Sequence, residues 1–542
     1  MKFLILLFTL FFGIISHSQT PPILWQKNIG GAGFDDLGRI DIPGSTDYFL
    51  VGGSNSNISG DKTENSRGGD DIWIVKMDVN HNILWDKTIG GDNYDVLRSA
   101  IVFNGSLFLC SLSNSSISGD KVVAPQNTDG TTDIWLIKLD FSSNIIWQKI
   151  YGGTADEGNG CEIDSLPNGN LLIGTTSKSG ISGNKTEANI GLNDFWLVEI
   201  SPNTGNILNQ KTIGSANQEK IGQILVRPSS ILIIGISETG VSGDKSDNGF
   251  GLTDTWLVQT DLNLTVIQDK CFGGISFEGS FGNNGNINFI DNYYYLIIPS
   301  SSTISGNKTA PYRGSFDGFE RPDYWLLKLD LNLNIIWDKT FGGNVDDNGR
   351  EVYQLSGNRL LIMGVSETNI SGNKTSPKYG GVDSWLIITD TSGNIIAQET
   401  YGGSLNDFLS QSPTIVNGVF YLSGASESPV SGVKTVPTNG GYDAWILEID
   451  ASGFLNTEKI EGVNTTISVY PNPTNGEVNF KFADLEEDVE VTFYSVDGKI
   501  LFSDRIQSNS VLKSYDLKVD NQIILYSLEG ERINYSGKIL MR

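Results

Sequence analysis

Short apolar runs separated by turns fill most of the chain, and their pattern predicts strands rather than helices. The run "LLIMGV" at 360–365 is apolar on both faces, and "WLIITD" at 385–390 is nearly so. Strands of this kind belong to sheets that are covered on both sides. Turns rich in Gly, Asn and Ser separate the runs, as in "LSGNR" at 355–359. We therefore expect an all-β protein.

An internal repeat organises these strands. The motif Asp-x-Trp followed by an apolar run occurs seven times, and its tryptophans are 60 to 69 residues apart. A turn and a strand ending in Gly-Gly follow each copy, as in "NIIWDKTFGG" at 334–343, and two further strand-like runs complete the repeat. Four-stranded sheets stacked around an axis would bury both faces of every strand. The sequence thus predicts a seven-bladed β-propeller, in preference to another all-β repeat array.

An eighth copy of the Gly-Gly strand stands before the first complete repeat. It reads "ILWQKNIGG" at 23–31, whereas the corresponding segment after the last Asp-x-Trp strand, "FLNTEKIEG" at 454–462, is degraded. We expect the first strand to complete the last blade, because this pairing closes the ring and covers its exposed edges.

Two charged positions recur in every repeat. An acid lies four residues after the second residue of the Gly-Gly element, which is Gly-Ser in the fourth copy, and a lysine ends the motif Ser-Gly-x-Lys. The acids are Asp35, Asp95, Glu157, Glu219, Glu278, Asp347 and Asp407, and the lysines are Lys62, Lys121, Lys185, Lys245, Lys308, Lys374 and Lys434. Because both loops should lie on one face of the ring, we expect these residues to form seven structural latches. Exposed ion pairs add only about 0 to 1 kcal/mol each, so their role would be largely geometric.

Calcium binding is the alternative role for this ring, because the loops are rich in Asp, Asn and Gly and carry two acids per lysine. No stretch has a recognised calcium-loop spacing, so we expect no cofactor and leave calcium open. His81 is the only histidine after the expected export signal, which excludes His-ligated metal clusters and Ser-His-Asp chemistry. A group repeated in every blade is also a poor candidate for the two distinct carboxyls of a glycosidase. We assign no catalytic residue.

All eleven tryptophans fall on repeat positions. They could be sugar platforms, but a tryptophan present in every blade is more often a wedge between blades, which is the interpretation we favour.

The fifth repeat differs most from the others. Its loop between Ser-Gly-x-Lys and Asp-x-Trp is the longest, and it reads "TAPYRGSFDGFERPDYW" at 309–325. Aromatic residues beside arginines on an otherwise acidic protein are typical of a binding hot spot. The candidate ligand-binding residues are Tyr312, Arg313, Phe316, Asp317, Phe319 and Arg321, next to Glu320. The alternative is an insertion that packs on its own surface.

Composition narrows the partners and the compartment. A net charge of −26 argues against nucleic acid or an anionic membrane surface as partner. Residues 1–18 have the form of an export signal, with Lys2 before the apolar run 3–15, and no later segment is apolar enough to span a membrane. The three cysteines, Cys110, Cys161 and Cys271, are too few for a disulfide framework, and we expect them to be buried apolar residues.

The repeat ends before the last 75 or so residues. The propeller should occupy residues 19–461, a linker 462–467, and a small β-sandwich 468–542. The segment "PNPTNG" at 471–476, the predicted hairpin "FYSVDGKIL" at 493–501 and the ending "GKILMR" resemble the type A C-terminal sorting domain of the Bacteroidetes type IX secretion system. The resemblance implies passage across the outer membrane with that machinery as partner. Its sorting motif would be Pro471, Asn472, Pro473, Asn475 and Gly476.

These features together predict an exported protein that is released or attached to the cell surface. The propeller also resembles tandem repeats of flavobacterial secreted proteins. This resemblance implies a fold and a location outside the cell, but no defined activity. We expect a binding or interaction protein with a glycan or protein ligand. The alternatives are a carbohydrate-active hydrolase or lyase with carboxylates on the long-loop face, and a purely structural surface protein.

Overall fold

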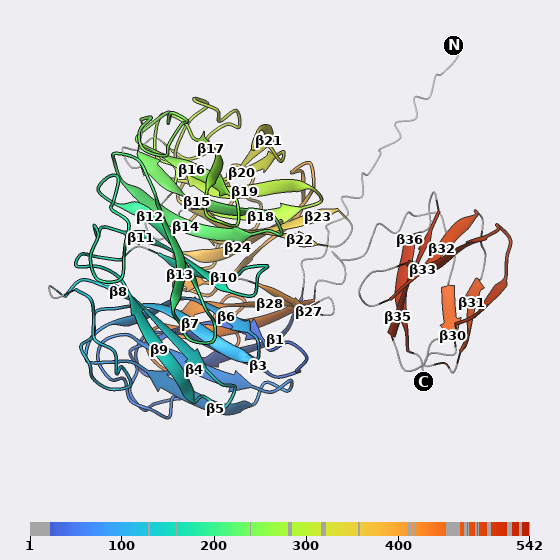
Figure 1. The fold of residues 1–542 in the computed structure, drawn as a ribbon. Helices are drawn as coiled ribbons and strands as arrows, with labels where there is room; N and C mark the ends of the chain where they lie inside the picture. Colours follow the sequence, from blue (N-terminus) through green and yellow to red (C-terminus); the bar gives the residue numbers. More distant parts are fainter. Residues whose placement is uncertain are drawn as a thin grey trace, which may run out of the picture. The chain divides into compact units, whose positions relative to one another are not determined.

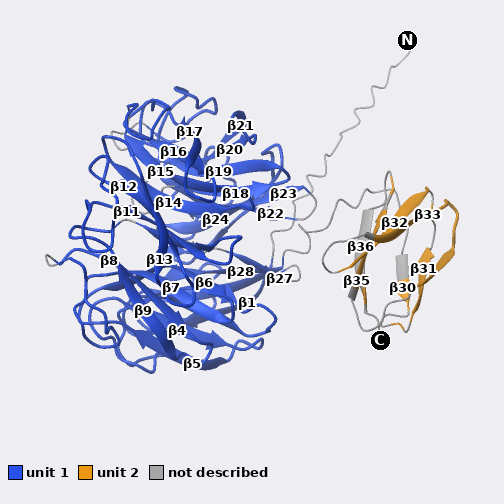
Figure 2. Ribbon diagram, viewed as in Figure 1, with its two compact units in different colours: residues 1–453 blue, residues 454–542 orange. Residues whose placement is uncertain are grey.

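The chain folds into two compact units, residues 1–453 and 454–542 (Figure 2). The computed structural model describes residues 22–127, 130–158, 160–238, 240–279, 285–315, 321–355, 358–409, 413–416 and 419–450 of the first unit. In the second unit it describes residues 467–470, 474, 476–482, 485, 487–495, 500–517, 523–530 and 534–540. The expected export signal lies outside the described residues, as do Pro471, Asn472, Pro473 and Asn475 of the sorting motif.

The first unit contains seven antiparallel sheets, six of them formed by four consecutive strands (Figure 1). The first three blades are β2 (Asp35–Asp41), β3 (Tyr48–Ser54), β4 (Asp71–Met77) and β5 (Ile83–Ile89); β6 (Asp95–Phe103), β7 (Ser106–Ser113), β8 (Asp133–Leu139) and β9 (Ile145–Tyr151); and β10 (Cys161–Ser165), β11 (Leu171–Ser177), β12 (Asp194–Ile200) and β13 (Ile207–Ile213). The next three are β14 (Glu219–Val226), β15 (Ile231–Glu238), β16 (Thr253–Thr260) and β17 (Val266–Phe272); β18 (Asn286–Ile290), β19 (Tyr293–Ser300), β20 (Asp323–Leu329) and β21 (Ile335–Phe341); and β22 (Asp347–Leu355), β23 (Arg359–Ser366), β24 (Asp383–Asp390) and β25 (Ile395–Tyr401).

The seventh blade joins the two ends of the propeller. It contains β26 (Asp407–Phe408), β27 (Thr414–Val416), β28 (Val419–Ser426) and β29 (Asp443–Asp450), with β1 (Ile23–Ile29) on the other side of β29. The first strands of successive blades contact one another around the ring, which makes them the innermost strands. The prediction of a β-propeller is thus confirmed.

Packing between blades explains why the strands are apolar on both faces. The tryptophan of every Asp-x-Trp motif is fully buried. Trp196, for example, shares a hydrophobic cluster with Phe108 and Leu136 of the preceding blade. These seven tryptophans are therefore wedges between blades, as expected, and not sugar platforms.

The first strand closes the ring as the sequence predicts. β1 pairs antiparallel with β29 from Ile23 opposite Ile449 to Ile29 opposite Ala444. The Gln26 side chain adds three further contacts, because its Oε1 accepts from the backbone N–H of Thr435 and from the indole of Trp445, and its Nε2 donates to the carbonyl of Val433. A strand from one end of the chain thereby covers an edge that the other end would leave open.

Deleting residues 19–31 should lower the melting temperature of the propeller by at least about 10 °C, because the last blade then loses its outer strand and the ring its closure. Circular dichroism of the mature protein with and without this segment measures the change, with a deletion of 19–21 alone as the control. Equal melting temperatures for all three proteins would contradict the closure.

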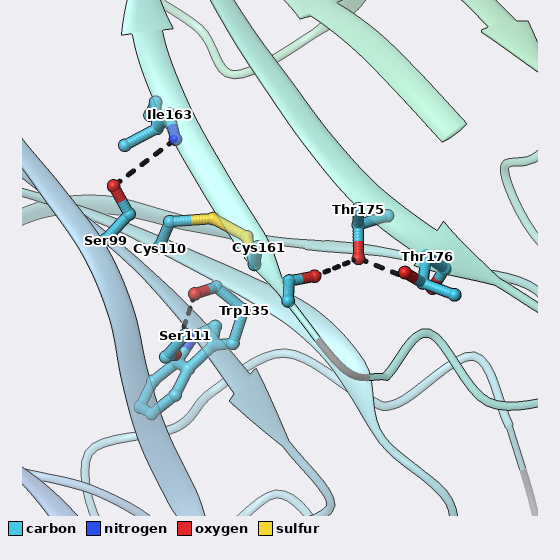
Figure 3. Close-up of a disulfide and its surroundings, with 9 residues drawn as sticks. Ser99, Cys110, Ser111, Trp135, Cys161, Ile163, Thr175 and Thr176 are labelled. Carbon is cyan, nitrogen blue, oxygen red and sulfur yellow. Dashed lines mark hydrogen bonds between the residues drawn. A yellow bond between two sulfur atoms is a disulfide. The ribbon is translucent and has the colours of Figure 1, made fainter. Parts of the chain in front are cut away.

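The expectation that all three cysteines are unpaired is wrong for two of them. Cys110 on β7 and Cys161 on β10 form a disulfide that joins the second and third blades (Figure 3), whereas Cys271 is a free, buried cysteine. The two bonded residues are 51 positions apart in the sequence. Sequence spacing did not reveal this pair, because their proximity arises only from the stacking of two blades. A disulfide fits the oxidising compartments that exported proteins reach.

Removing this disulfide should destabilise the propeller by up to about 4 kcal/mol, since the bond closes a loop of 51 residues in the unfolded chain. Chemical unfolding of the double variant Cys110→Ser/Cys161→Ser measures the loss. Cys271→Ser is the matched control, because Cys271 has no disulfide partner. A double variant as stable as the control would show that the bond contributes nothing.

The second unit contains two antiparallel sheets. One has the order β30 (Ile467–Tyr470), β31 (Glu477–Phe482), β34 (Leu512–Asp516), and the other β33 (Ile500–Ile506), β32 (Val489–Ser495), β35 (Ile523–Glu529), β36 (Asn534–Leu540). Phe480 of the first sheet and Phe493 of the second share one hydrophobic core. Across the described part of the chain, no helix is long and apolar enough to cross a membrane.

Candidate functional site

The seven lysines of the Ser-Gly-x-Lys loops are buried, with at most 2% of their surface exposed. Their ammonium groups donate to hydroxyl oxygens at 2.6 to 3.1 Å, and in six blades they lie 4.7 to 5.8 Å from the ring centre of the Asp-x-Trp indole. The hydroxyls belong to Thr88, Ser113, Ser177, Ser237, Thr340, Thr400 and Ser426, in the order of the lysines. A buried ammonium is tolerated here because oxygens and an aromatic face replace its water.

The predicted lysine–carboxylate contact is indirect. In the third blade the Ser177 hydroxyl accepts from Lys185 at 3.1 Å and donates to Glu157 at 3.0 Å. The fourth and seventh blades repeat this bridge through Ser237 and Ser426. No spacing in the sequence marks these hydroxyls, because strands from two parts of the repeat bring them into place.

The backbone beside each lysine is fixed by the same tryptophan. In every blade the indole N–H donates to an Asp or Gln on the outer strand, and this residue also accepts from the backbone N–H after the lysine. The Asp or Gln residues are Asp86, Gln148, Gln210, Asp269, Asp338, Gln398 and Gln26. These hydrogen bonds fix the Ser-Gly-x-Lys loop against the outer strand of its own blade.

The repeated acids lie at the junctions between blades. Each carboxylate accepts from the backbone N–H four residues before it at 2.6 to 3.1 Å. Its own backbone N–H donates at 2.7 to 2.9 Å to the residue preceding the Asp-x-Trp aspartate of the previous blade. Two buried carboxyls therefore meet at every junction, for example Asp133 with Glu157 and Asp323 with Asp347.

Burial shifts both kinds of group toward their neutral forms. Burial and, to a smaller extent, repulsion from the paired acid raise the pKa of Glu157 to about 7 and that of Asp323 to about 8. Burial also lowers the pKa of Lys62 and Lys374 to about 8, although nearby carboxylates act in the opposite direction. The junctions thus hold protons at pH values where free carboxyls are ionised.

The stability of the propeller should fall as the pH rises from about 5 to 8. Folded carboxyls with raised pKa values hold protons that the unfolded chain releases near pH 4, so the free energy of unfolding decreases through this window. Thermal melts at constant ionic strength measure the slope. Asp323→Asn, whose amide cannot ionise, should flatten it relative to Asp330→Asn in an exposed turn. A stability that rises from pH 5 to 8 would refute this account.

The described part of the ring offers no cluster of ligands for calcium. Within the described residues, no group of three or more His, Cys, Asp or Glu side chains is placed to hold a metal ion. The acids of the ring occur in pairs, and their nearest cationic groups are the buried lysines. The described residues therefore assign no site to calcium.

The fifth-blade loop is only partly described, because residues 316–320, which include Phe316, Asp317 and Phe319, lie outside the described residues. The Tyr312 hydroxyl donates to the carbonyl of Arg321 at 2.7 Å, and the Arg321 guanidinium lies 3.3 Å from Asp346. The Arg313 Nε donates to the carbonyl of Thr340 at 3.2 Å. These contacts tie the described ends of the loop to one another, to β21 and to the segment that leads into β22.

Arg313 also lines a groove of about 540 Å³ between the fifth and sixth blades. Lys339 and Phe341 on β21 form one wall, and the turn at 393–395 forms the other. The only acid among the lining residues, Asp338, is already engaged by the Trp325 indole and by the backbone of 309–310. The groove is therefore bordered by two cations on a strongly acidic protein.

Sequence analysis also missed charged residues on the innermost strands. Arg98 and Arg350 lie three residues after the repeated acids of their blades, where the first, third and fourth blades have glycine. Glu162 and Glu351 pair with Gly174 and Met363, each three residues before a serine of the neighbouring strand, and this shared register is visible only in the structure.

A curated protein is similar to a large part of this chain. The regulatory protein FlaEY of Caulobacter vibrioides is 23% identical over 395 residues, which are 70% of this chain and 35% of FlaEY. The chain thus spans about a third of the length of that relative.

Several solved structures are similar at low identity. Hydrazine synthase of Kuenenia stuttgartiensis has a TM-score of 0.37 at 10% identity, covering 73% of this chain and 94% of its own. The endosialidase of phage phi92 has 0.37 at 10%, covering 95% and 87%, and a cobalt-substituted apocarotenoid oxygenase of Synechocystis has 0.38 at 12%, covering 74% and 88%.

The C-terminal unit gives the most specific match. Residues 468–536 match the family described as secretion system C-terminal sorting domain. This match agrees with the resemblance of "PNPTNG" and of the strands that follow it, and the domain directs its cargo to the cell surface or the extracellular space. The chain is therefore an exported β-propeller protein that carries a type IX secretion sorting domain at its C-terminus.

Proposed function

We propose that the propeller is an extracellular binding module and that the groove between the fifth and sixth blades holds its ligand. The observation that carries this proposal is the position of Arg313, which belongs to the most divergent loop of the repeat and lines a groove of about 540 Å³. Ligand sites are usually concave and occur where a repeated scaffold departs from its repeat.

The charge of the groove indicates the kind of ligand. Arg313 and Lys339 border it, while the Asp338 carboxylate accepts hydrogen bonds from Trp325, Thr309 and Ala310. An anionic glycan or an acidic protein segment would complement these cations. The candidate residues Phe316, Asp317 and Phe319 belong to the same loop and lie outside the described residues.

The two alternatives receive less support. A hydrolase acting through the repeated carboxylates would need them to reach a substrate, but these acids have no exposed surface and accept hydrogen bonds from their own loops. A purely structural role would not account for the long loop of the fifth blade, which places Arg313 beside the groove.

A screen of acidic and neutral polysaccharides tests the proposal on the mature protein. We expect binding to an acidic ligand that Arg313→Ala and Lys339→Ala each weaken by about tenfold, because each removes one cation from the groove. Lys149→Ala is the matched control, since Lys149 lies at the position on β9 that Lys339 occupies on β21. Binding that all three variants retain, or no binding to any ligand of the screen, would contradict the groove.

A further inference from the structure

Three aromatic side chains meet where the seventh blade contacts the first, on the face that carries the Gly-Gly loops. Phe34 lies directly before β2, Phe408 ends β26, and Tyr442 lies directly before β29. The ring centres of Phe34 and Tyr442 are 5.8 Å apart, and those of Phe408 and Tyr442 are 6.0 Å apart. These three residues therefore form one cluster, which we call the aromatic platform.

The aromatic platform departs from the repeat. At the corresponding positions of the other junctions between blades, the only aromatic residues are Tyr94 and Phe277, and each is alone at its junction. The position of Tyr442, for example, is held by Asp70 in the first blade and by Thr253 in the fourth. Because the other junctions form without such a cluster, packing between blades does not require it.

Part of the platform is open to solvent. Phe34 is 39% exposed, and Phe408 and Tyr442 are half-buried. Aromatic rings offer a large contact area and lose little conformational freedom when they bind, so exposed rings held in place by a rigid scaffold are suited to recognition.

An amide and a carboxylate are fixed on one side of the platform. The Asn55 Oδ1 accepts from the backbone N–H of Phe34 at 2.7 Å, and the Asn55 Nδ2 donates to the Asp70 carboxylate at 2.9 Å. Asp70 is half-buried, so a solute can reach its carboxylate.

A second amide and carboxylate are fixed on the other side. The Asn406 Nδ2 donates to the Glu427 carboxylate at 2.5 Å and to the hydroxyl of Tyr442 at 3.3 Å, while its Oδ1 accepts from the backbone N–H of Val382 at 2.9 Å. Glu427 is half-buried as well. The platform is therefore bordered on both sides by polar groups in fixed positions.

This combination of groups suits a sugar. The C–H groups of a pyranose ring pack against an aromatic face, and its hydroxyls find donors and acceptors in amides and carboxylates. The charged groups on both sides are carboxylates, and the chain has a net charge of −26, so an anionic sugar would be repelled.

From this arrangement we infer a binding site for a neutral oligosaccharide at the junction of the seventh and first blades. Phe34 and Tyr442 would stack against the sugar rings, and Asp70 and Glu427 would accept from their hydroxyls. The cationic groove beside the fifth blade is a different site, and neither site depends on the other.

Calorimetric titration of the mature protein with cellohexaose, laminarihexaose and maltohexaose tests the platform. We expect saturable binding of at least one of them, and Phe34→Ala should weaken it about tenfold, because the sugar loses an aromatic face. Phe277→Ala is the matched control and should bind normally. Phe277 holds the same repeat position as Phe34, but it pairs with Thr253 instead of lying beside a tyrosine.

Two further measurements separate a lost contact from a damaged fold or a general effect of charge. Phe34→Tyr keeps the aromatic face and should keep the affinity within about twofold. The affinity of the unmodified protein should also change less than about twofold between about 50 and 500 mM NaCl, because the ligand is neutral. Binding of an acidic ligand in the groove should weaken over the same range.

Four results would overturn the site. They are no saturable heat with any of the three hexasaccharides up to about 10 mM, equal affinity in Phe34→Ala and the unmodified protein, an equal loss in Phe277→Ala, and a loss in Arg313→Ala alone. The last result would assign the neutral sugar to the groove. Failure at the platform leaves the binding of acidic ligands in the groove unaffected, so the two proposals stand or fall separately.

Discussion

The whole propeller depends on burying charged groups at the places where blades meet. Every blade places a lysine ammonium against a hydroxyl oxygen, and in six blades also against a tryptophan, while every junction brings two carboxyls together away from water. An unsatisfied buried charge is costly, so the surrounding hydroxyls and backbone N–H groups must take fixed positions. The long loops are fixed for the same reason, because their backbone supplies those groups.

This constraint separates architecture from function. A residue that recurs in all seven blades is needed to hold a junction or a loop, and it is buried too deeply to reach a ligand. The residues available for recognition are those that one blade has and the others lack. In the described chain, the long loop of the fifth blade is such a departure from the repeat, and it carries Arg313 beside the groove.

Much of the fold could be predicted from the sequence, because the repeat fixes it many times over. Seven copies of Asp-x-Trp predicted the repeated sheets, and the isolated strand at 23–31 predicted the closure that the pairing of β1 with β29 shows. The lysines and acids were predicted to form latches, but in the third, fourth and seventh blades a hydroxyl lies between the two groups. The hydroxyl between Lys185 and Glu157 belongs to Ser177 at the end of β11, whereas Glu157 precedes β10 and Lys185 lies in the loop after β11. The spacing of these residues in the sequence therefore does not predict the contact.

The sequence by itself determined the class of the fold, the number of repeats and the sorting domain, because periodicity and local motifs specify these. The tertiary structure decided which residues meet across blades: the disulfide of Cys110 with Cys161 and the carboxyl pairs. These partners are separated by tens to hundreds of residues. Their meeting depends on strand register, which one sequence does not reveal.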